Sequence, residues 1–313
     1  MSRHPSSGYS SRAASTTGDL VADRILRLFE AAGAPLLMVA LLVAKAYRRY
    51  AGFGRHDAPV ARRLYKTIGV YPVIDHFYEP WPSTPEVGRR DLPGISLDLD
   101  EQVSLLREFE PETFNVDLAK NSEYTYGDAD LLWHMVRHYR PSMMVEVGSG
   151  YSTRIVAMSG AVGRHIAIDP QPRADIVGLD VESIRQPVQD VGLSLFRELG
   201  PGDVLFIDSS HVIRPKGDVL HLYLRVLPEL AKGVIVHVHD VFTPWDYPRR
   251  WLEKELRLWN EQYLLEGMLS VGKFHPVLAA HALWRERRDD VERVCPSTVG
   301  RDASPSAFWF EVK

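Results

Sequence analysis

Short apolar runs alternate with helix-like segments in the second half of the chain, and this alternation constrains the fold more than any other feature. The runs 142–148 (SMMVEVG), 165–169 (HIAID) and 203–208 (DVLFID) are separated by segments with the apolar period of helices. A fourth run, 233–240 (GVIVHVHD), precedes a further helical segment. Apolar strands separated by helices form parallel sheets that are covered on both faces.

The complete pattern predicts seven strands. A short strand within 181–190 and two C-terminal strands, 275–281 (HPVLAAH) and 306–312 (SAFWFEV), join the four runs above. We therefore expect an α/β fold with a doubly wound, mostly parallel, seven-stranded Rossmann-like sheet and helices on both faces, preceded by an N-terminal helical and irregular extension. One long helix is expected over 249–269. Such sheets bind ligands at the carboxyl ends of their strands, so the site is expected there.

The first 126 residues lack this alternation and predict three segments. Residues 1–18 are rich in Ser, Thr and Gly, which favours a disordered tail. Residues 19–66 contain two helical patterns interrupted at Gly33–Pro35 and predict a helical hairpin. Residues 67–126 include a Pro-rich stretch and predict an irregular cap or substrate-binding region, and 127–313 hold the sheet.

The helical hairpin carries an apolar stretch with basic flanks. Ala31–Ala44 contains no charged residue, whereas 24–66 contains nine Lys or Arg and two Asp or Glu. Fourteen helical residues reach about 21 Å, which is shorter than the ~30 Å hydrocarbon core of a membrane, so no span is expected. Two interpretations stay open. The hairpin packs on its own domain or on a second subunit of a homo-oligomer, or it lies on an anionic membrane surface.

Net charge and cysteine content exclude some classes of protein. The formal net charge of −4 disfavours bulk nucleic-acid binding, which normally needs a basic face. Cys295 is the single cysteine, so we expect neither a disulfide framework nor a thiolate zinc site. These features predict a cytoplasmic protein, or one that is peripheral to the inner membrane surface, with no nucleic-acid partner.

The first strand ends in two glycines beside an acidic residue. Glu146 is followed by Gly148 and Gly150, which let a ligand approach the backbone, and the next helix offers unpaired N–H groups. A dinucleotide site would have a third glycine where this chain has Thr153. A carboxylate at this turn favours a ligand with an ammonium group over a pyrophosphate. Asp169, nineteen residues after Gly150, ends the second strand, where a carboxylate can accept both ribose hydroxyls of a nucleoside.

These segments resemble the class I S-adenosylmethionine-dependent methyltransferases over 127–313. VEVGSGYST resembles the first motif of that family, IAID the second, PVQD the segment that contacts adenine, and GDVLFIDSSHV and GVIVHVHD the fourth and fifth strands. The resemblance implies S-adenosylmethionine as cofactor. It implies that Glu146 contacts the methionine amino group and that Asp169 contacts the ribose. Gln189 or Asp190 would contact the adenine, and Ser152 and Tyr126 would lie at the carboxylate end. The residues of the glycine turn, Gly148, Ser149 and Gly150, would lie behind the cofactor.

Acidic and histidine residues follow the fourth and fifth strands. Asp208 and His211 come after one, and His239 and Asp240 after the other. In a first interpretation, similar to metal-dependent O-methyltransferases, Asp208, His239 and Asp240 bind a divalent ion (Mg²⁺, Mn²⁺, Fe²⁺ or Zn²⁺) that holds a hydroxyl while His211 removes its proton. In a second, no metal is needed, and His211 or His239 is the base that Asp208 orients. His237 is expected to be a packed core histidine.

The sequence therefore predicts an enzyme that methylates an oxygen of a small-molecule, sugar or amphiphilic acceptor. Residues 20–126 and the loop 241–250 are expected to select this acceptor. In that loop Trp245, Tyr247 and Arg249 could touch it, or the aromatic rings could pack beneath the loop. Two alternatives stay open: an N-methyltransferase on the same fold, and a non-catalytic cofactor-binding or membrane-associated partner protein.

Overall fold

The computed structural model describes residues 33–36, 38–43, 88–111, 124, 126–172, 176–253, 255, 257–301 and 304–313. The predicted tail, most of the predicted hairpin and much of the predicted cap region lie outside these residues. The chain divides into two units, Met1–Trp81 and Pro82–Lys313, each of which is described by itself. In the part of the chain that the structure describes, every helix is too short or too polar to cross a bilayer.

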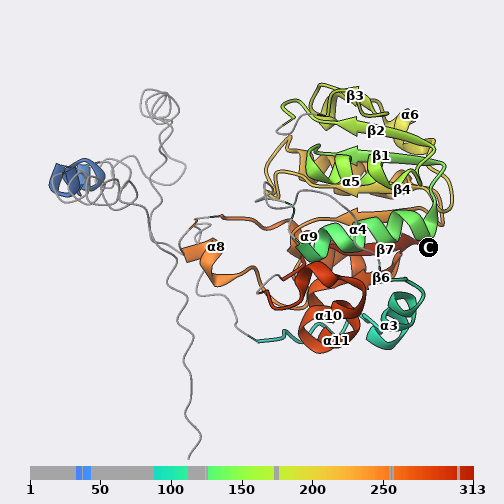
Figure 1. Ribbon diagram of the computed structural model, residues 1–313. Coiled ribbons are helices and arrows are strands. Elements are labelled where there is room, and N and C mark those ends of the chain that lie inside the picture. Colours follow the sequence, from blue (N-terminus) through green and yellow to red (C-terminus); the bar gives the residue numbers. More distant parts are fainter. Residues whose placement is uncertain are drawn as a thin grey trace, which may run out of the picture. The chain divides into compact units, whose positions relative to one another are not determined.

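A seven-stranded sheet with the strand order β3-β2-β1-β4-β5-β7-β6 forms the centre of the second unit (Figure 1). Its strands are β1 (Met143–Val147), β2 (Arg164–Ile168), β3 (Glu182–Ile184), β4 (Val204–Ile207), β5 (Ile235–Val238), β6 (Phe274–Ala279) and β7 (Phe308–Val312). Strands β1 to β5 pair in parallel, and β7 runs antiparallel between β5 and β6. The order reverses between β1 and β4, so the predicted doubly wound, mostly parallel sheet is confirmed.

Helices cover both faces of the sheet because alternate strand residues point to opposite sides. Val145 and Leu205 belong to one apolar core and Met144 and Phe206 to the other. The first core includes side chains from α6 (Leu193–Arg197), α7 (Asp218–His221), the π-helical η3 (Leu222–Val226), the 3₁₀ helix η4 (Leu227–Glu229) and α9 (Glu261–Leu269). The second includes side chains from α3 (Leu99–Arg107), α4 (Tyr126–Tyr139), α5 (Tyr151–Ser159), α10 (Ala280–Glu286) and α11 (Arg288–Val294) (Figure 1). Two further 3₁₀ turns are η2 (Val188–Asp190) and η5 (Pro296–Thr298).

The single helix predicted over 249–269 is wrong. The chain instead forms two helices, α8 (Arg249–Glu253) and α9, and the described residues 257–260 before α9 are not helical. Asn260 leaves the helical conformation, with φ at −150°, because its backbone and side chain bond to another segment. Its N–H donates to the carbonyl of His211 at 3.0 Å, and its Oδ1 accepts from the N–H of Ile213 at 2.6 Å. These bonds place the start of α9 beside the carboxyl end of β4.

Candidate active site

The turn after β1 packs so closely against the backbone of Asp208 that it requires glycine. Gly148 has φ at 87°, and a Cβ atom there would lie 2.5 Å from the carbonyl oxygen of Asp208. Only glycine tolerates both the dihedral and this approach. The N–H of Gly150 donates to Thr153 Oγ1 at 2.9 Å. The residue that replaces the third glycine of a dinucleotide motif therefore caps the start of α5.

The structure brings the two halves of the predicted nucleoside site together. Asp169 Oδ2 accepts from the N–H of Ser149 at 2.9 Å and from its hydroxyl at 3.0 Å. Oδ1 of the same carboxylate accepts from the N–H of Gln171 at 2.7 Å. Asp169 thus holds the glycine turn in place while its side chain stays partly exposed. Its contact with a ribose remains a prediction.

Glu146 lies deeper than its predicted contact with an amino group suggests. Its side chain is fully buried, and it accepts from Ser152 Oγ at 2.5 Å and lies 3.0 Å from His165 Nε2. A buried carboxylate that is partnered in this way stabilises the fold. Glu146 and Ser152 therefore join β1, α5 and β2, a function that the sequence did not reveal. Their contacts with a cofactor remain predictions.

The remaining predicted cofactor residues lie on two separate elements. Gln189 and Asp190 lie on η2, beside a cavity of about 570 Å³ that is also lined by residues of α7. Gln189 Nε2 donates to the carbonyl of Lys216 at 3.3 Å. Tyr126 begins α4, and the guanidinium of Arg301 lies 4.2 Å from the centre of its ring.

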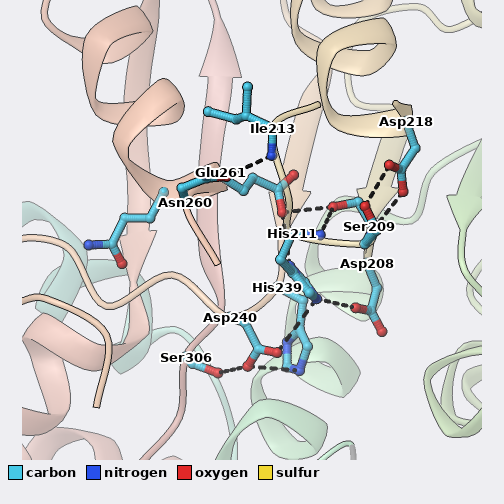
Figure 2. Close-up of polar contacts among 12 residues, drawn as sticks. Asp208, Ser209, His211, Ile213, Asp218, His239, Asp240, Asn260, Glu261 and Ser306 are labelled. Atoms are coloured by element: carbon cyan, nitrogen blue, oxygen red, sulfur yellow. Dashed lines mark hydrogen bonds and ion pairs between the residues drawn. The ribbon is translucent and has the colours of Figure 1, made fainter. Parts of the chain in front are cut away.

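His211 is the centre of the polar cluster at the ends of β4 and β5 (Figure 2). Its Nε2 lies 3.2 Å from Asp208 Oδ1 and 3.7 Å from Asp240 Oδ2, and its Nδ1 lies 2.9 Å from Glu261 Oε2. The imidazole is only 6% exposed, whereas the Asp208 side chain is 39% exposed. The predicted residues thus converge, and Glu261 joins them.

These contacts shift the acid–base behaviour of the cluster. Burial lowers the pKa of His211, but hydrogen bonds to Asp208 and Glu261 and the charge of Asp240 outweigh it, and the pKa lies well above its usual value. Desolvation raises the pKa of Asp208, yet the hydrogen bond from His211 and the charge of His239 bring it below the usual value. The imidazolium and the carboxylate each favour the charged form of the other.

A second set of contacts supports Asp240 from β7 and α4. Ser306 Oγ donates to Asp240 Oδ1 at 3.0 Å, and His239 Nε2 lies 3.6 Å from the same oxygen. Asp128 Oδ1 accepts from the N–H groups of Ser306 and Ala307, each at 2.9 Å. Burial raises the pKa of Asp128 although His239 and these N–H groups lower it. Asp240 is therefore positioned by Ser306, which precedes β7, and indirectly by Asp128 of α4, which holds the backbone of Ser306.

Two residues of the cluster have strained backbones. His211 has φ at 58° and Asp240 has φ at 57°, in the left-handed region that non-glycine residues rarely occupy. Each such residue costs about 1–3 kcal/mol and persists only where its surroundings determine it. Both lie at the carboxyl end of a strand, where the fold binds ligands, so the strain points to a functional site.

The predicted metal ligands do not form a metal site. Among the described residues, no group of three His, Cys, Asp or Glu side chains is placed to hold a metal ion. The reason lies in the position of His211, whose ring stands between Asp208 and Asp240, where a cation would otherwise bridge them. Asp208, His239 and Asp240 as they lie do not fit a metal ion, and we derive no step through one.

Of the other predicted residues, Arg249 is exposed, whereas His237, Trp245 and Tyr247 pack in the interior. His237 has no exposed surface, stacks on Phe206 with ring centres 4.1 Å apart and meets the edge of Trp309. Burial lowers its pKa well below the usual value, which agrees with the expected core histidine. Trp245 and Tyr247 are buried as well, so the aromatic residues of the loop 241–250 pack beneath it.

Three residues of the site were missed by the sequence analysis: Asp128, Glu261 and Ser306. Glu261 fell inside the predicted long helix, where a glutamate normally faces solvent. Asp128 could have been recognised, because it is an acidic residue near the start of an apolar helical segment. The structure buries it there. No sequence pattern marks Ser306.

Comparisons with known proteins agree with this arrangement. Residues 145–241, which contain the glycine turn, Asp169 and the polar residues that follow β4 and β5, match a family model described as a methyltransferase domain. An uncharacterized protein of Archaeoglobus fulgidus is 32% identical over 161 residues, which are 40% of this chain and 72% of that protein. This identity places the two chains in one family.

Several solved methyltransferase structures are similar to the chain. The plantazolicin methyltransferase BpumL, in complex with a monoazolic desmethylPZN analog and SAH, is 10% identical over 62% of this chain and 86% of its own, with a TM-score of 0.41. The N-methyltransferase NodS from Bradyrhizobium japonicum is 10% identical over 62% and 98%, with a TM-score of 0.39. An O-methyltransferase from Bacillus cereus, in complex with SAH, is 15% identical over 69% and 90%, also with a TM-score of 0.39.

The position of Asp169 predicts a loss of nucleoside binding in Asp169→Ala. The variant removes the acceptor for Ser149 and the carboxylate that is predicted to accept two ribose hydroxyls, so we expect affinity for S-adenosylmethionine to fall about tenfold or more in calorimetry. Glu182→Ala, on the exposed edge strand β3, is the control and should bind like the unmodified protein. Equal affinities of the two variants would contradict the assignment.

Proposed function

The chain belongs to the class I S-adenosylmethionine-dependent methyltransferases, and we propose that it methylates an oxygen of a small-molecule, sugar or amphiphilic acceptor. The observation that carries the proposal is the cluster of Asp208, His211 and Asp240. A histidine between carboxylates at the strand ends can remove the proton of a hydroxyl group. The cluster lies after β4 and β5, and β4 is the neighbour of the strand that leads to the glycine turn.

Asp208 and His211 have separate roles in the proposed deprotonation. S-adenosylmethionine, when bound, supplies an electrophilic methyl group on its sulfonium. Asp208 is the more exposed of the two aspartates, so it would accept the first hydrogen bond from the acceptor hydroxyl. His211 Nε2, which lies 3.2 Å from Asp208, would take the proton. Transfer is an in-line displacement, so the protein mainly orients the two reactants and removes this proton.

Asp240 and His239 complete the proposed site from β5. Asp240 adds negative charge 3.7 Å from His211 Nε2, which stabilises the imidazolium that forms when the proton is taken. Burial lowers the pKa of His239, but the charges of Asp240, Asp208 and Asp128 raise it above its usual value. A cationic His239 in this position would orient Asp240 rather than act as the base.

A turnover assay tests the proposed function directly. Purified protein with S-adenosylmethionine is offered catechol, methyl glucoside, dodecyl maltoside or benzylamine, and released S-adenosylhomocysteine is measured. We expect turnover with at least one oxygen acceptor, and the same rate in the presence of a chelator because the cluster is complete without a metal. Turnover of benzylamine alone would indicate N-methylation. Cofactor binding without any turnover would favour the non-catalytic alternative, and loss in chelator that Mn²⁺ restores would favour the metal mechanism.

The raised pKa of His211 predicts an alkaline rise in activity. His211 must be neutral to accept a proton, and its pKa lies well above 6.5, so the active fraction grows as pH rises from neutral into the alkaline range. We expect the turnover number to follow this rise. His211→Gln should lower the turnover number about 100-fold and remove the rise, while affinity for S-adenosylmethionine is retained. A pH-independent rate in the unmodified enzyme would contradict the role of His211.

We further propose that the first unit contacts an anionic membrane surface, which would suit an amphiphilic acceptor. Leu36 and Val43 lie in its described helical residues and are 77% and 63% exposed. The nine basic residues of 24–66 would add attraction to anionic lipids. A second copy of the chain is the competing occupant of this apolar surface.

Vesicle sedimentation tests this contact. The full chain should sediment with phosphatidylglycerol vesicles and be released by high salt, and a double variant with Leu36→Asp and Val43→Asp should stay in solution. Val299→Asp, at a position 58% exposed in the second unit, is the matched control and should sediment normally. The membrane proposal would be overturned if the full chain stays in solution. It would also be overturned if the full chain is a dimer and only the double variant dissociates it.

A further inference from the structure

The start of α9 is attached to the loop that carries His211. The N–H groups of Asn260 and Glu261 both donate to the carbonyl of His211, at 3.0 and 3.2 Å. Asn260 Oδ1 accepts from the N–H of Ile213 at 2.6 Å (Figure 2). Bonds to the carbonyl of His211 and to the N–H of Ile213 therefore help to hold the left-handed conformation of the histidine, since such a conformation persists only where the surroundings determine it.

The side chain of Glu261 reaches the inner edge of the imidazole. Its Oε2 accepts from Ser209 Oγ at 2.8 Å and lies 2.9 Å from His211 Nδ1. In the arrangement in which Oε2 accepts from both neighbours, Nδ1 carries the proton of the hydrogen bond to Glu261. The side chain of Glu261 is 1% exposed, and a carboxylate is rarely buried so deeply unless it is paired. The position at the N-terminus of α9 also favours a negative charge.

The surroundings of His211 leave the Nε2 edge of its ring as the one that can take part in the proposed reaction. Trp259 lies against His211 with ring centres 4.2 Å apart. Nε2 faces Asp208 and Asp240, the two carboxylates with more exposed side chains. Nδ1 faces Glu261, which is buried. The two nitrogens of the imidazole thus have separate surroundings.

We propose that Glu261 is the positioning residue of the methyl-transfer site: it fixes the ring of His211 with Nδ1 protonated and Nε2 directed to the acceptor. The inference rests on the proposed role of His211 as base. Glu261 does not touch the acceptor in this arrangement. It acts by orienting the histidine and by stabilising the imidazolium after proton transfer, as the acidic member of a catalytic triad does.

Histidine ring ¹⁵N NMR of the full-length protein tests this without any acceptor. Asp208, Asp240, Glu261 and the cationic form of His239 all act on His211, but only Glu261 bonds to Nδ1. We expect Nδ1 to carry the proton in the neutral form, and Glu261→Gln to lower the pKa of His211 by about one unit or more. The signal is assigned as the one that His211→Gln removes.

Glu266→Gln is the matched control. Glu266 is buried on the same helix, but it bonds to Arg90 and Thr243 rather than to His211. It should leave the titration of His211 unchanged. A His211 titration that Glu261→Gln does not alter, or that both variants alter equally, would overturn the inference.

Turnover provides the second measurement. With the oxygen acceptor that gives the fastest S-adenosylhomocysteine release, Glu261→Gln should lower the turnover number about 100-fold and move the alkaline rise to lower pH. The KM for S-adenosylmethionine should stay the same, which a general loss of structure would not allow. If no oxygen acceptor is turned over, the proposed function fails, whereas the NMR titration still decides whether Glu261 controls His211.

Ser209→Ala provides a further test if Glu261→Gln does not fold. The variant keeps both charges but removes one donor to Glu261 Oε2, so the carboxylate becomes a stronger acceptor for His211. The pKa of His211 should then shift upward, opposite to the shift in Glu261→Gln. A downward shift or no shift in Ser209→Ala would contradict the proposed coupling.

Discussion

The imidazole of His211 holds three carboxylates together, and the arrangement of the site depends on it. Asp208, Asp240 and Glu261 come from the ends of β4 and β5 and from the start of α9. Carboxylates gathered in this way repel one another and are costly to bury unless a cation compensates them. The buried imidazolium of His211 compensates part of this charge and links the three elements, and His239, whose pKa is also raised, lies beside Asp240. Ser306 and Asp128 extend the same network to β7 and α4.

This arrangement explains why two residues keep strained backbones. The left-handed conformation of His211 turns its ring back between the strand ends, and that of Asp240 brings its carboxylate toward the same point. An unstrained loop would leave each side chain free to face solvent. The hydrogen bonds from α9 and β7 compensate the strain, so the polar groups are organised before any ligand binds. Preorganised charge of this kind lowers the barrier of a reaction more than groups that must move into place.

The sequence predicts the sheet well because strands and helices are recognised from neighbouring residues. The apolar runs that became β1, β2, β4 and β5 and the reversal of strand order follow from local periodicity and from the rules of parallel sheets. The contacts between the residues of the site do not follow from local periodicity. His211 and Glu261 are 50 residues apart and Asp128 and Ser306 are 178 apart. The position of the His211 ring is a further case: Asp208 and Asp240 converge on it as expected, but only the dihedral of His211 places the ring between them. The predicted long helix is divided into α8 and α9, and α9 begins only after Asn260, which bonds to the loop of His211.

The contact between Gly148 and Asp208 joins the proposed cofactor-binding turn to the proposed catalytic cluster. The N–H of Asp208 donates to the carbonyl of Val147 at 2.9 Å, and Gly148 leaves no room for a side chain. Neighbouring strands lie about 4.8 Å apart, and a reacting oxygen must come within about 3–3.5 Å of the methyl carbon. In the proposed mechanism the methyl donor binds at the end of β1 and the acceptor at the ends of the neighbouring β4 and of β5. The glycine at position 148 would then let the turn approach the residues that follow β4.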